Sequence, residues 1–118
     1  MAVTAERKVT IAFSGDLESQ NSFYATANTA SPAQIQLVEL ASGTNTITPP
    51  SVSGIVNTAV TFIPPSGNTA LVTLKGVAGD TGIPLHLTDP TTVAIDTTFT
   101  TLVLSAASTV SGFRLVWS

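Results

Sequence analysis

The sequence predicts an all-β protein, an antiparallel β-sandwich, on three observations. Short stretches rich in Thr, Val and Ile recur along the 118 residues, and β-branched residues favour strands. Pro, Gly, Asn and Asp separate these stretches at short intervals, as they do in turns. No stretch of about 10–15 residues shows the helical apolar period that alternates with strands in an α/β fold. Among sandwiches, we expect a jelly roll rather than an immunoglobulin-like arrangement.

The first strands are predicted near the N-terminus. Residues 8–14 alternate, so that Val9, Ile11 and Phe13 lie on one face and polar side chains on the other. A polar loop follows, and a second strand is expected at residues 23–27.

The third element, residues 33–40, alternates at Ile35 and Leu37. This pattern also permits a short helix, but nothing around it is helical, and we therefore predict a strand. Seven more short, β-branched strands are expected after it, each bounded by Pro or Gly chemistry or by small polar residues. They are residues 44–48, 58–63, 69–75, 83–87, 91–96, 98–104 and 111–117.

Apolar patterning assigns faces to three of these strands. Residues 70–75 and 101–104 carry apolar side chains in both registers, which is typical of a strand covered on two sides. In the last strand, Phe113, Leu115 and Trp117 share one face. The chain is therefore expected to end inside a sheet.

Length and composition limit the remaining possibilities. One domain over residues 1–118 is expected, because ~100–150 residues is the commonest domain size. The chain has no cysteine, which excludes disulfides, thiolate metal sites and a cysteine nucleophile. The N-terminus lacks the pattern of a signal peptide. No apolar run approaches the ~18 residues of a membrane helix, so we expect no membrane association.

Charge is scarce. Seven acids and four bases give a net charge of −3, which argues against nucleic-acid binding by phosphate neutralisation. Charged residues make up 9% of the chain, against about 25% in ordinary soluble domains. Twenty Thr and twelve Ser supply polarity in their place.

The triplet Asp80-Thr81-Gly82 is the one with which aspartic proteases present a catalytic carboxylate. A single copy would suit a homodimeric enzyme in which each subunit contributes one Asp. The context differs, because Gly76-Val77-Ala78-Gly79 precedes the triplet and Ile83-Pro84 follows it. We interpret the segment as a glycine-rich turn between two strands, and keep a homodimeric aspartic protease using Asp80 as an alternative.

Other candidate sites have simpler interpretations. His86 and Asp89 could pair, but one imidazole lacks further ligands or a nucleophile. Asp16 and Glu18 share a loop without the acidic density of a calcium site. The glycines at 76–82 lack the Lys and the helix of a phosphate-binding loop. We therefore predict no catalytic, cofactor-binding or metal-binding residue, and no cofactor.

Two long stretches, residues 41–74 and 97–113, contain no charged side chain. Charges usually guard the edge strands of a monomeric sheet. We therefore expect other copies of the chain, or a larger assembly, to cover these strands. The alternative is that Thr hydroxyls supply enough polarity, because Thr suits strands well.

These features resemble the small structural proteins of tailed bacteriophage virions. The resemblance covers roughly the C-terminal half, through residues 74–96 and the ending Ser111-Gly112-Phe113-Arg114-Leu115-Val116-Trp117-Ser118. It implies a sandwich or jelly roll that attaches to a capsid or tail, usually as a symmetric oligomer. It assigns no role to any individual residue.

The function expected from the sequence is a non-enzymatic virion component, such as a capsid decoration, head-fibre, tail or adaptor protein. Its partners would be further copies of itself and other virion proteins, with no nucleic acid and no membrane. It would be made in the host cytoplasm without a signal peptide. One alternative is a carbohydrate- or receptor-binding sandwich module, which would need Tyr24 or Trp117 exposed to stack on a sugar. The other is the protease using Asp80.

Overall fold

The chain divides into two compact units, residues 1–33 and 34–118. The computed structural model describes residues 4–11, 25–32, 34–51, 56–96 and 98–118. The strand residues predicted at 12–14 and 23–24, together with Asp16, Glu18 and Tyr24, lie outside these ranges. One domain over residues 1–118 stays a prediction.

The first unit contains an antiparallel pair of strands. Strands β1 (Thr4–Ile11) and β2 (Ala25–Pro32) pair over their whole length, from Thr4 opposite Pro32 to Ile11 opposite Ala25. The first strand begins four residues earlier than the predicted 8–14, and the second continues beyond the predicted 23–27. Alternation in residues 8–14 therefore found the strand but not its start.

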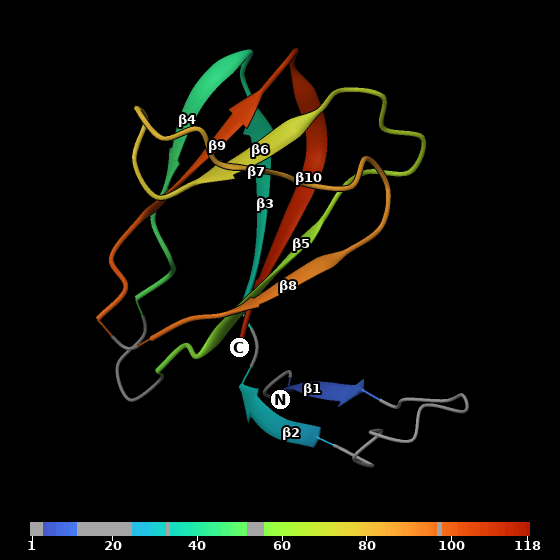
Figure 1. Cartoon of the computed structure of the whole chain (residues 1–118), viewed down its shortest axis with the longest axis vertical. Coiled ribbons are helices and arrows are strands. Elements are labelled where there is room, and N and C mark those ends of the chain that lie inside the picture. The colour runs from blue at the N-terminus through green and yellow to red at the C-terminus, as the bar shows by residue number, and fades with distance from the viewer. Residues whose placement is uncertain (1–3, 12–24, 33, 52–55, 97) are drawn as a thin grey trace, which may run out of the picture. The chain divides into compact units, whose positions relative to one another are not determined.

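The second unit confirms the predicted all-β sandwich. Two antiparallel four-stranded sheets pack together, in the orders β3-β10-β5-β8 and β4-β9-β6-β7 (Figure 1). The strands are β3 (Gln34–Leu40), β4 (Gly43–Ile47), β5 (Ala59–Ile63), β6 (Val72–Lys75), β7 (Ile83–Pro84), β8 (Thr91–Ala94), β9 (Leu102–Ala106) and β10 (Val110–Trp117).

Pairing in the sandwich is nested. Strand β3 pairs with β10, β4 with β9, β5 with β8 and β6 with β7. Only the innermost pair joins two strands that are consecutive in the chain and lie in the same sheet. Two further pairs, β10 with β5 and β6 with β9, complete the sheets. Strands distant in sequence are therefore central neighbours.

The core lies between the two sheets. Its largest fully buried side chains are Trp117, Phe62, Phe113, Leu40, Leu104, Leu115 and Val60. The last strand places Phe113, Leu115 and Trp117 together in the core, each 0% exposed, as its alternation predicts. Strand β9 is covered on both faces, also as predicted, since Leu102, Val103 and Leu104 are all buried.

A bulge in β10 sets which of its side chains face the core. Val110 pairs with Leu40, but Phe113 pairs with Val38, so β10 contains one extra residue. Gly112 lies in this bulge with a φ of 79°, a conformation that glycine adopts without strain. Without the extra residue, a period of two from Val110 would turn Phe113 away from the core.

Three predicted strands need correction. The strand expected at 69–75 is Val72–Lys75, and Leu71, which the apolar pattern expects to be covered, is 43% exposed. The strand expected at 83–87 is only Ile83–Pro84, although the N–H of Leu85 still donates to the carbonyl of Val72 at 2.9 Å. The strand expected at 98–104 begins at Leu102 instead. Before it, the backbone N–H and the hydroxyl of Thr98 both donate to Asp96 Oδ1, at 3.0 and 2.9 Å. Both bonds lower the pKa of the Asp96 carboxyl, and the bond from the backbone N–H has the larger effect. They also hold the segment in a turn.

We expect residues 34–118 to fold without residues 1–33. Residues 34–118 form a compact unit by themselves and contain the described hydrophobic core cluster, and burial of apolar surface is the main stabilising term. A chain of residues 34–118 should therefore melt cooperatively, close to the temperature of the whole chain. Fluorescence of Trp117, the single tryptophan, follows the transition. Absence of a cooperative transition would contradict this expectation.

Candidate functional site

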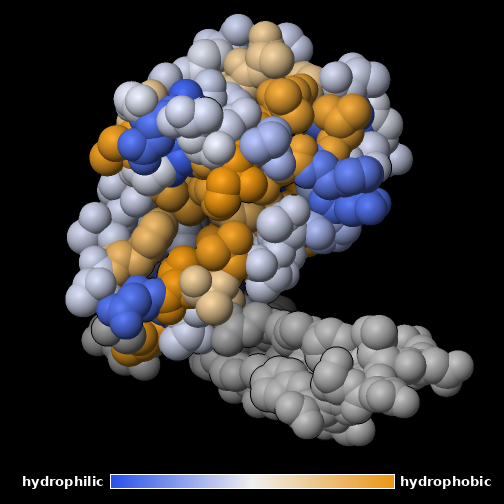
Figure 2. Space-filling model, in the orientation of Figure 1, coloured by the Kyte–Doolittle hydropathy of each residue, from blue (hydrophilic) through white to orange (hydrophobic). Residues whose placement is uncertain are grey.

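An apolar cavity of ≈ 570 Å³ opens between the two sheets on the side of β7 and β8. It falls in the range of ordinary ligand pockets, roughly 300–1,000 Å³. Figure 2 shows apolar side chains gathering on this face of the molecule. The lining residues are Val60, Phe62, Leu74, Lys75, Gly76, Asp80, Thr81, Gly82, Ile83, Val93, Ile95, Phe99 and Leu102.

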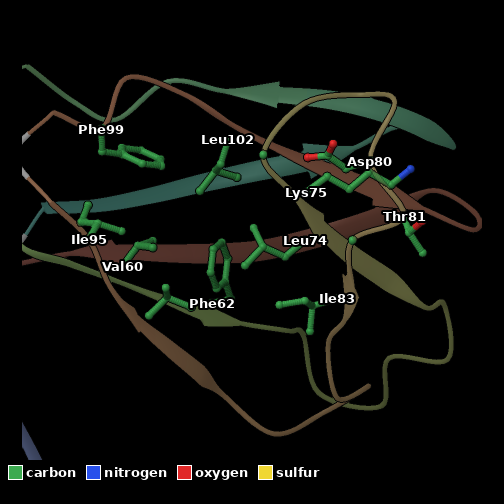
Figure 3. Close-up of a pocket in the computed structure, with 13 residues that line it drawn as sticks. Val60, Phe62, Leu74, Lys75, Asp80, Thr81, Ile83, Ile95, Phe99 and Leu102 are labelled. Atoms are coloured by element: carbon green, nitrogen blue, oxygen red, sulfur yellow. The ribbon is translucent and has the colours of Figure 1, made fainter.

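The cavity exists because the edge strands on this side are short. Strand β7 has two residues and β8 has four, so neither covers the core completely. Leu74, Val93 and Phe99 consequently remain partly exposed while packing against the core. In Figure 3 the polar side chains of Lys75, Asp80 and Thr81 lie together at one end of the cavity, away from the apolar ones. This arrangement offers apolar contacts with a polar rim.

The Asp80-Thr81-Gly82 triplet lies in the loop between β6 and β7, the turn that the glycines predict. The backbone N–H of Val77 donates to Asp80 Oδ2 at 3.1 Å, and the N–H of Asp80 donates to the carbonyl of Val77, also at 3.1 Å. The Asp80 carboxylate thus stabilises the turn formed by residues 77–80. Gly82 is the last residue of the loop before β7 and has a φ of 79°.

Replacing Gly82 tests this turn. A Cβ at Gly82 would lie 2.6 Å from the carbonyl oxygen of Leu74, and the left-handed backbone adds about 1–2 kcal/mol for a non-glycine residue. Gly82→Ala should therefore lower the free energy of unfolding by more than this conformational cost. Urea unfolding measures the change.

Two glycines provide matched controls. A Cβ at Gly79 meets nothing within 4 Å, so Gly79→Ala should change stability by less than about 0.5 kcal/mol. Gly67→Ala adds a Cβ at a φ of 72° in open space and isolates the conformational cost. Equal effects of Gly67→Ala and Gly82→Ala would show that the contact with Leu74 is unimportant.

The hydrogen bonds found for His86 in the described ranges are local and come from backbone N–H groups, not from a nucleophilic side chain. The backbone N–H groups of Thr88 and Asp89 donate to His86 Nδ1 at 3.2 and 2.9 Å. Nδ1 thus faces these two backbone donors, and Asp89 Oδ2 lies 3.7 Å from it. Both side chains are well exposed, at 61% and 76%. The histidine is hydrogen-bonded locally.

Metal-ligating and membrane-spanning features are likewise not found in the described part of the chain. No group of three or more His, Cys, Asp or Glu lies close enough there to hold a metal ion. Of the segments that the structure describes, none forms a long apolar helix able to cross a membrane.

Trp117 is not placed to stack on a sugar. Its side chain is 0% exposed, and its Nε1–H donates to Gln36 Oε1 at 3.1 Å. The ring of Phe99 lies beside it, with the ring centroids 6.0 Å apart. The Trp117 side chain is therefore part of the hydrophobic core. Tyr24, the other candidate for stacking on a sugar, lies outside the described residues.

A second surface, on the outside of the sheet β3-β10-β5-β8, was missed in the sequence. Ile35 and Leu37 point outward from β3 and are 62% and 69% exposed. Val116 and Arg114 of β10 lie directly opposite them in the ladder, and paired residues share a face. We call Ile35, Leu37, Glu39, Arg114 and Val116 the outer patch. The alternation of Ile35 and Leu37 predicts a shared face, but not that this face is exposed.

The described side chains thus form two surfaces able to contact another molecule. The cavity is concave and apolar with a polar rim, whereas the outer patch lies on a sheet face. Neither surface combines a nucleophile with a hydrogen-bonded general base, the arrangement that acyl-transfer catalysis uses. No protein-family model, no curated protein and no solved structure matches the chain.

Proposed function

We propose that the protein is a non-enzymatic structural component of a tailed-bacteriophage virion, in the role of capsid decoration, head-fibre, tail or adaptor protein. It acts by oligomeric assembly, with further copies and other virion proteins as partners. The observation that carries the proposal is the outer patch. It leaves two large aliphatic side chains, Ile35 and Leu37, more than 60% exposed beside each other on one edge strand.

The free edges of the sandwich support assembly. The four edge strands are β3, β8, β4 and β7, and edge strands of monomers usually carry charges or proline. Here β4 and β8 contain no charged residue, and β3 contains only Glu39. Pro84 protects β7. Low charge at such positions is typical of surfaces that become buried in an interface core.

The nested pairing supports the same proposal through the fold. A chain folded back on itself, first strand with last and second with second-last, and then rolled into two sheets is a jelly roll. An immunoglobulin-like sandwich has more hairpins between consecutive strands. We therefore infer a jelly roll, an architecture used by viral capsid proteins and also by lectins. The fold supports the proposal by analogy, because one fold hosts many functions, and the outer patch supports it physically.

The first test is the solution mass of the purified protein, measured by light scattering coupled to size exclusion. We expect a discrete oligomer in the parent protein and a smaller species for Leu37→Lys, because a buried ammonium would disfavour the contact. Val77→Lys is the matched control, since Val77 is 62% exposed but lies in the β6–β7 loop. If both variants had the same mass in solution, the outer patch would be excluded as the surface through which the copies assemble.

The second test concerns the virion itself. Particles of the phage whose genome encodes the protein are purified and analysed by mass spectrometry. The protein should be present at a fixed ratio to the major capsid protein. Its absence from purified particles would overturn the virion proposal whatever its solution mass. In the same preparation, Asp80→Asn should incorporate like the parent protein, because an Asn side-chain oxygen can still accept the bond from Val77. A protease acting through Asp80 would lose its activity instead.

A further inference from the structure

The outer patch is self-complementary in charge. It contains one acid, Glu39, and one base, Arg114, both exposed. Within the described ranges, neither of them forms an ion pair with an opposite charge. The aliphatic side chains of Ile35, Leu37 and Val116 lie around and between them on the same face. Two opposite charges without an ion-pair partner among the described residues therefore lie together on an apolar surface.

We propose that the outer patch binds the outer patch of a second copy in a twofold symmetric dimer. The inference rests on the proposed function and names the partner of that surface. A twofold contact brings the same residues together in reverse order, so that each contact between two positions occurs twice. Glu39 then meets Arg114 of the second copy, and Arg114 meets Glu39 of the second copy. Ile35 and Leu37 become buried between the sheets.

Geometry favours this order of contact. Arg114 lies opposite Leu37 in the ladder, and Glu39 lies two residues further along β3 on the same face. The two charges are thus displaced from each other along the strands, as reciprocal pairing across a twofold axis requires. Two sheets stacked face to face normally lie about 10 Å apart with side chains interdigitating, a spacing that long Glu and Arg side chains can bridge.

A second copy fits better than other occupants of this surface. A partner of different sequence would need its own base and acid at the matching spacing, whereas a second copy supplies both automatically. Pairing through the free edge of β3 is a different contact. It would leave Ile35 and Leu37 exposed, because side chains of a strand project above and below the sheet. An oligomer formed by edge pairing should therefore keep its affinity when charges on the outer patch are changed, whereas the face-to-face dimer should not.

Charge reversal and mixing test the proposal. In a homodimer of Glu39→Arg, two Arg–Arg contacts replace the ion pairs, and Arg114→Glu creates two Glu–Glu contacts. Like charges facing each other weaken association strongly, so each variant alone should have a dimer Kd at least ~100-fold weaker than the parent. Mixed in equal amounts, the two variants should form a heterodimer in which every contact is again Glu with Arg.

The double variant, Glu39→Arg with Arg114→Glu on one chain, should likewise dimerise close to the parent's affinity. Asp89→Arg and Lys75→Glu make the same changes in charge outside the outer patch and serve as controls. Fluorescence of the buried Trp117 verifies that each variant is folded. Sedimentation equilibrium of the single variants, their mixture and the double variant gives each Kd.

The outcomes separate the two proposals. Weakening by both single variants together with recovery in the mixture supports the twofold dimer. A parent oligomer that both single variants leave intact overturns the dimer, while assembly by another surface, such as a free edge, remains. A monomeric parent also overturns the dimer, and detection of the protein in purified particles then decides separately on the virion role.

Discussion

A chain that ends at Gly112 is expected not to fold. It lacks most of β10, which lies between β3 and β5 in its sheet. The deletion removes Phe113, Leu115 and Trp117, all 0% exposed, and burying each such side chain stabilises by ~1.5–3 kcal/mol. Together they match much of the net stability of a domain, about 5–15 kcal/mol. The deletion also removes the ladder partners of both neighbouring strands.

Circular dichroism during heating measures this loss, because the shortened chain contains no tryptophan. We expect no cooperative transition and a spectrum without the β-sheet signal of the whole chain. The chain of residues 34–118, which loses more residues but keeps β10, is the control and should melt normally. A soluble chain of residues 1–112 that melts cooperatively would contradict the central role of β10.

Trp117→Ala should destabilise the sandwich by about 3–5 kcal/mol, the usual cost of truncating a buried Trp or Phe to Ala. The side chain is 0% exposed and packs beside Phe99. Its removal also leaves Gln36 Oε1 without the Trp117 donor, and a polar atom that loses its partner adds to the cost.

Urea unfolding followed by circular dichroism gives the change in the free energy of unfolding. Val77→Ala is the control, because Val77 is 62% exposed, and surface changes of this kind stay within about 0.5 kcal/mol. If Trp117→Ala were as mild as the control, the ring would contribute little to the core. Trp117→Ala keeps the backbone pairing of β10 that ending the chain at Gly112 removes.

Local patterns in the sequence are enough to predict the strand content and several faces. The alternation of Phe113, Leu115 and Trp117 identifies a core face because one side of that strand is wholly buried. The turn at Asp80 follows from its glycines. Both features depend on residues close together in the chain, where period and turn chemistry are informative.

The pairing of strands could not be predicted in this way. Val38 and Phe113 are neighbours in a ladder, and nothing in either segment specifies the other. The bulge at Gly112 could not be predicted for a related reason. Val110 and Phe113 are three residues apart, and this odd spacing indicates a bulge only when both side chains are known to be buried on the same face. Asp96 likewise shortened a predicted strand through hydrogen bonds that compete with the ladder.

The two candidate surfaces depend on tertiary structure as well. Ile35 and Leu37 share a face by alternation, but the neighbours of β3 decide that this face points outward. The cavity arises because β7 ends at Pro84 and leaves the core uncovered beside it. The outer patch also needs Arg114, which is distant in sequence and is brought beside Leu37 only by the pairing of β10 with β3.

The nested pairing of the strands has a consequence for how the protein is made. The sheet that holds β3, β5 and β8 has a gap at its centre until β10 has been synthesised, because β10 pairs with both β3 and β5 and follows all three strands in the sequence. Such distant pairings make folding slow, in the range of milliseconds to seconds. The sandwich is therefore expected to form only after β10 has been made, and the earlier strands stay unpaired during an interval in which aggregation competes with folding.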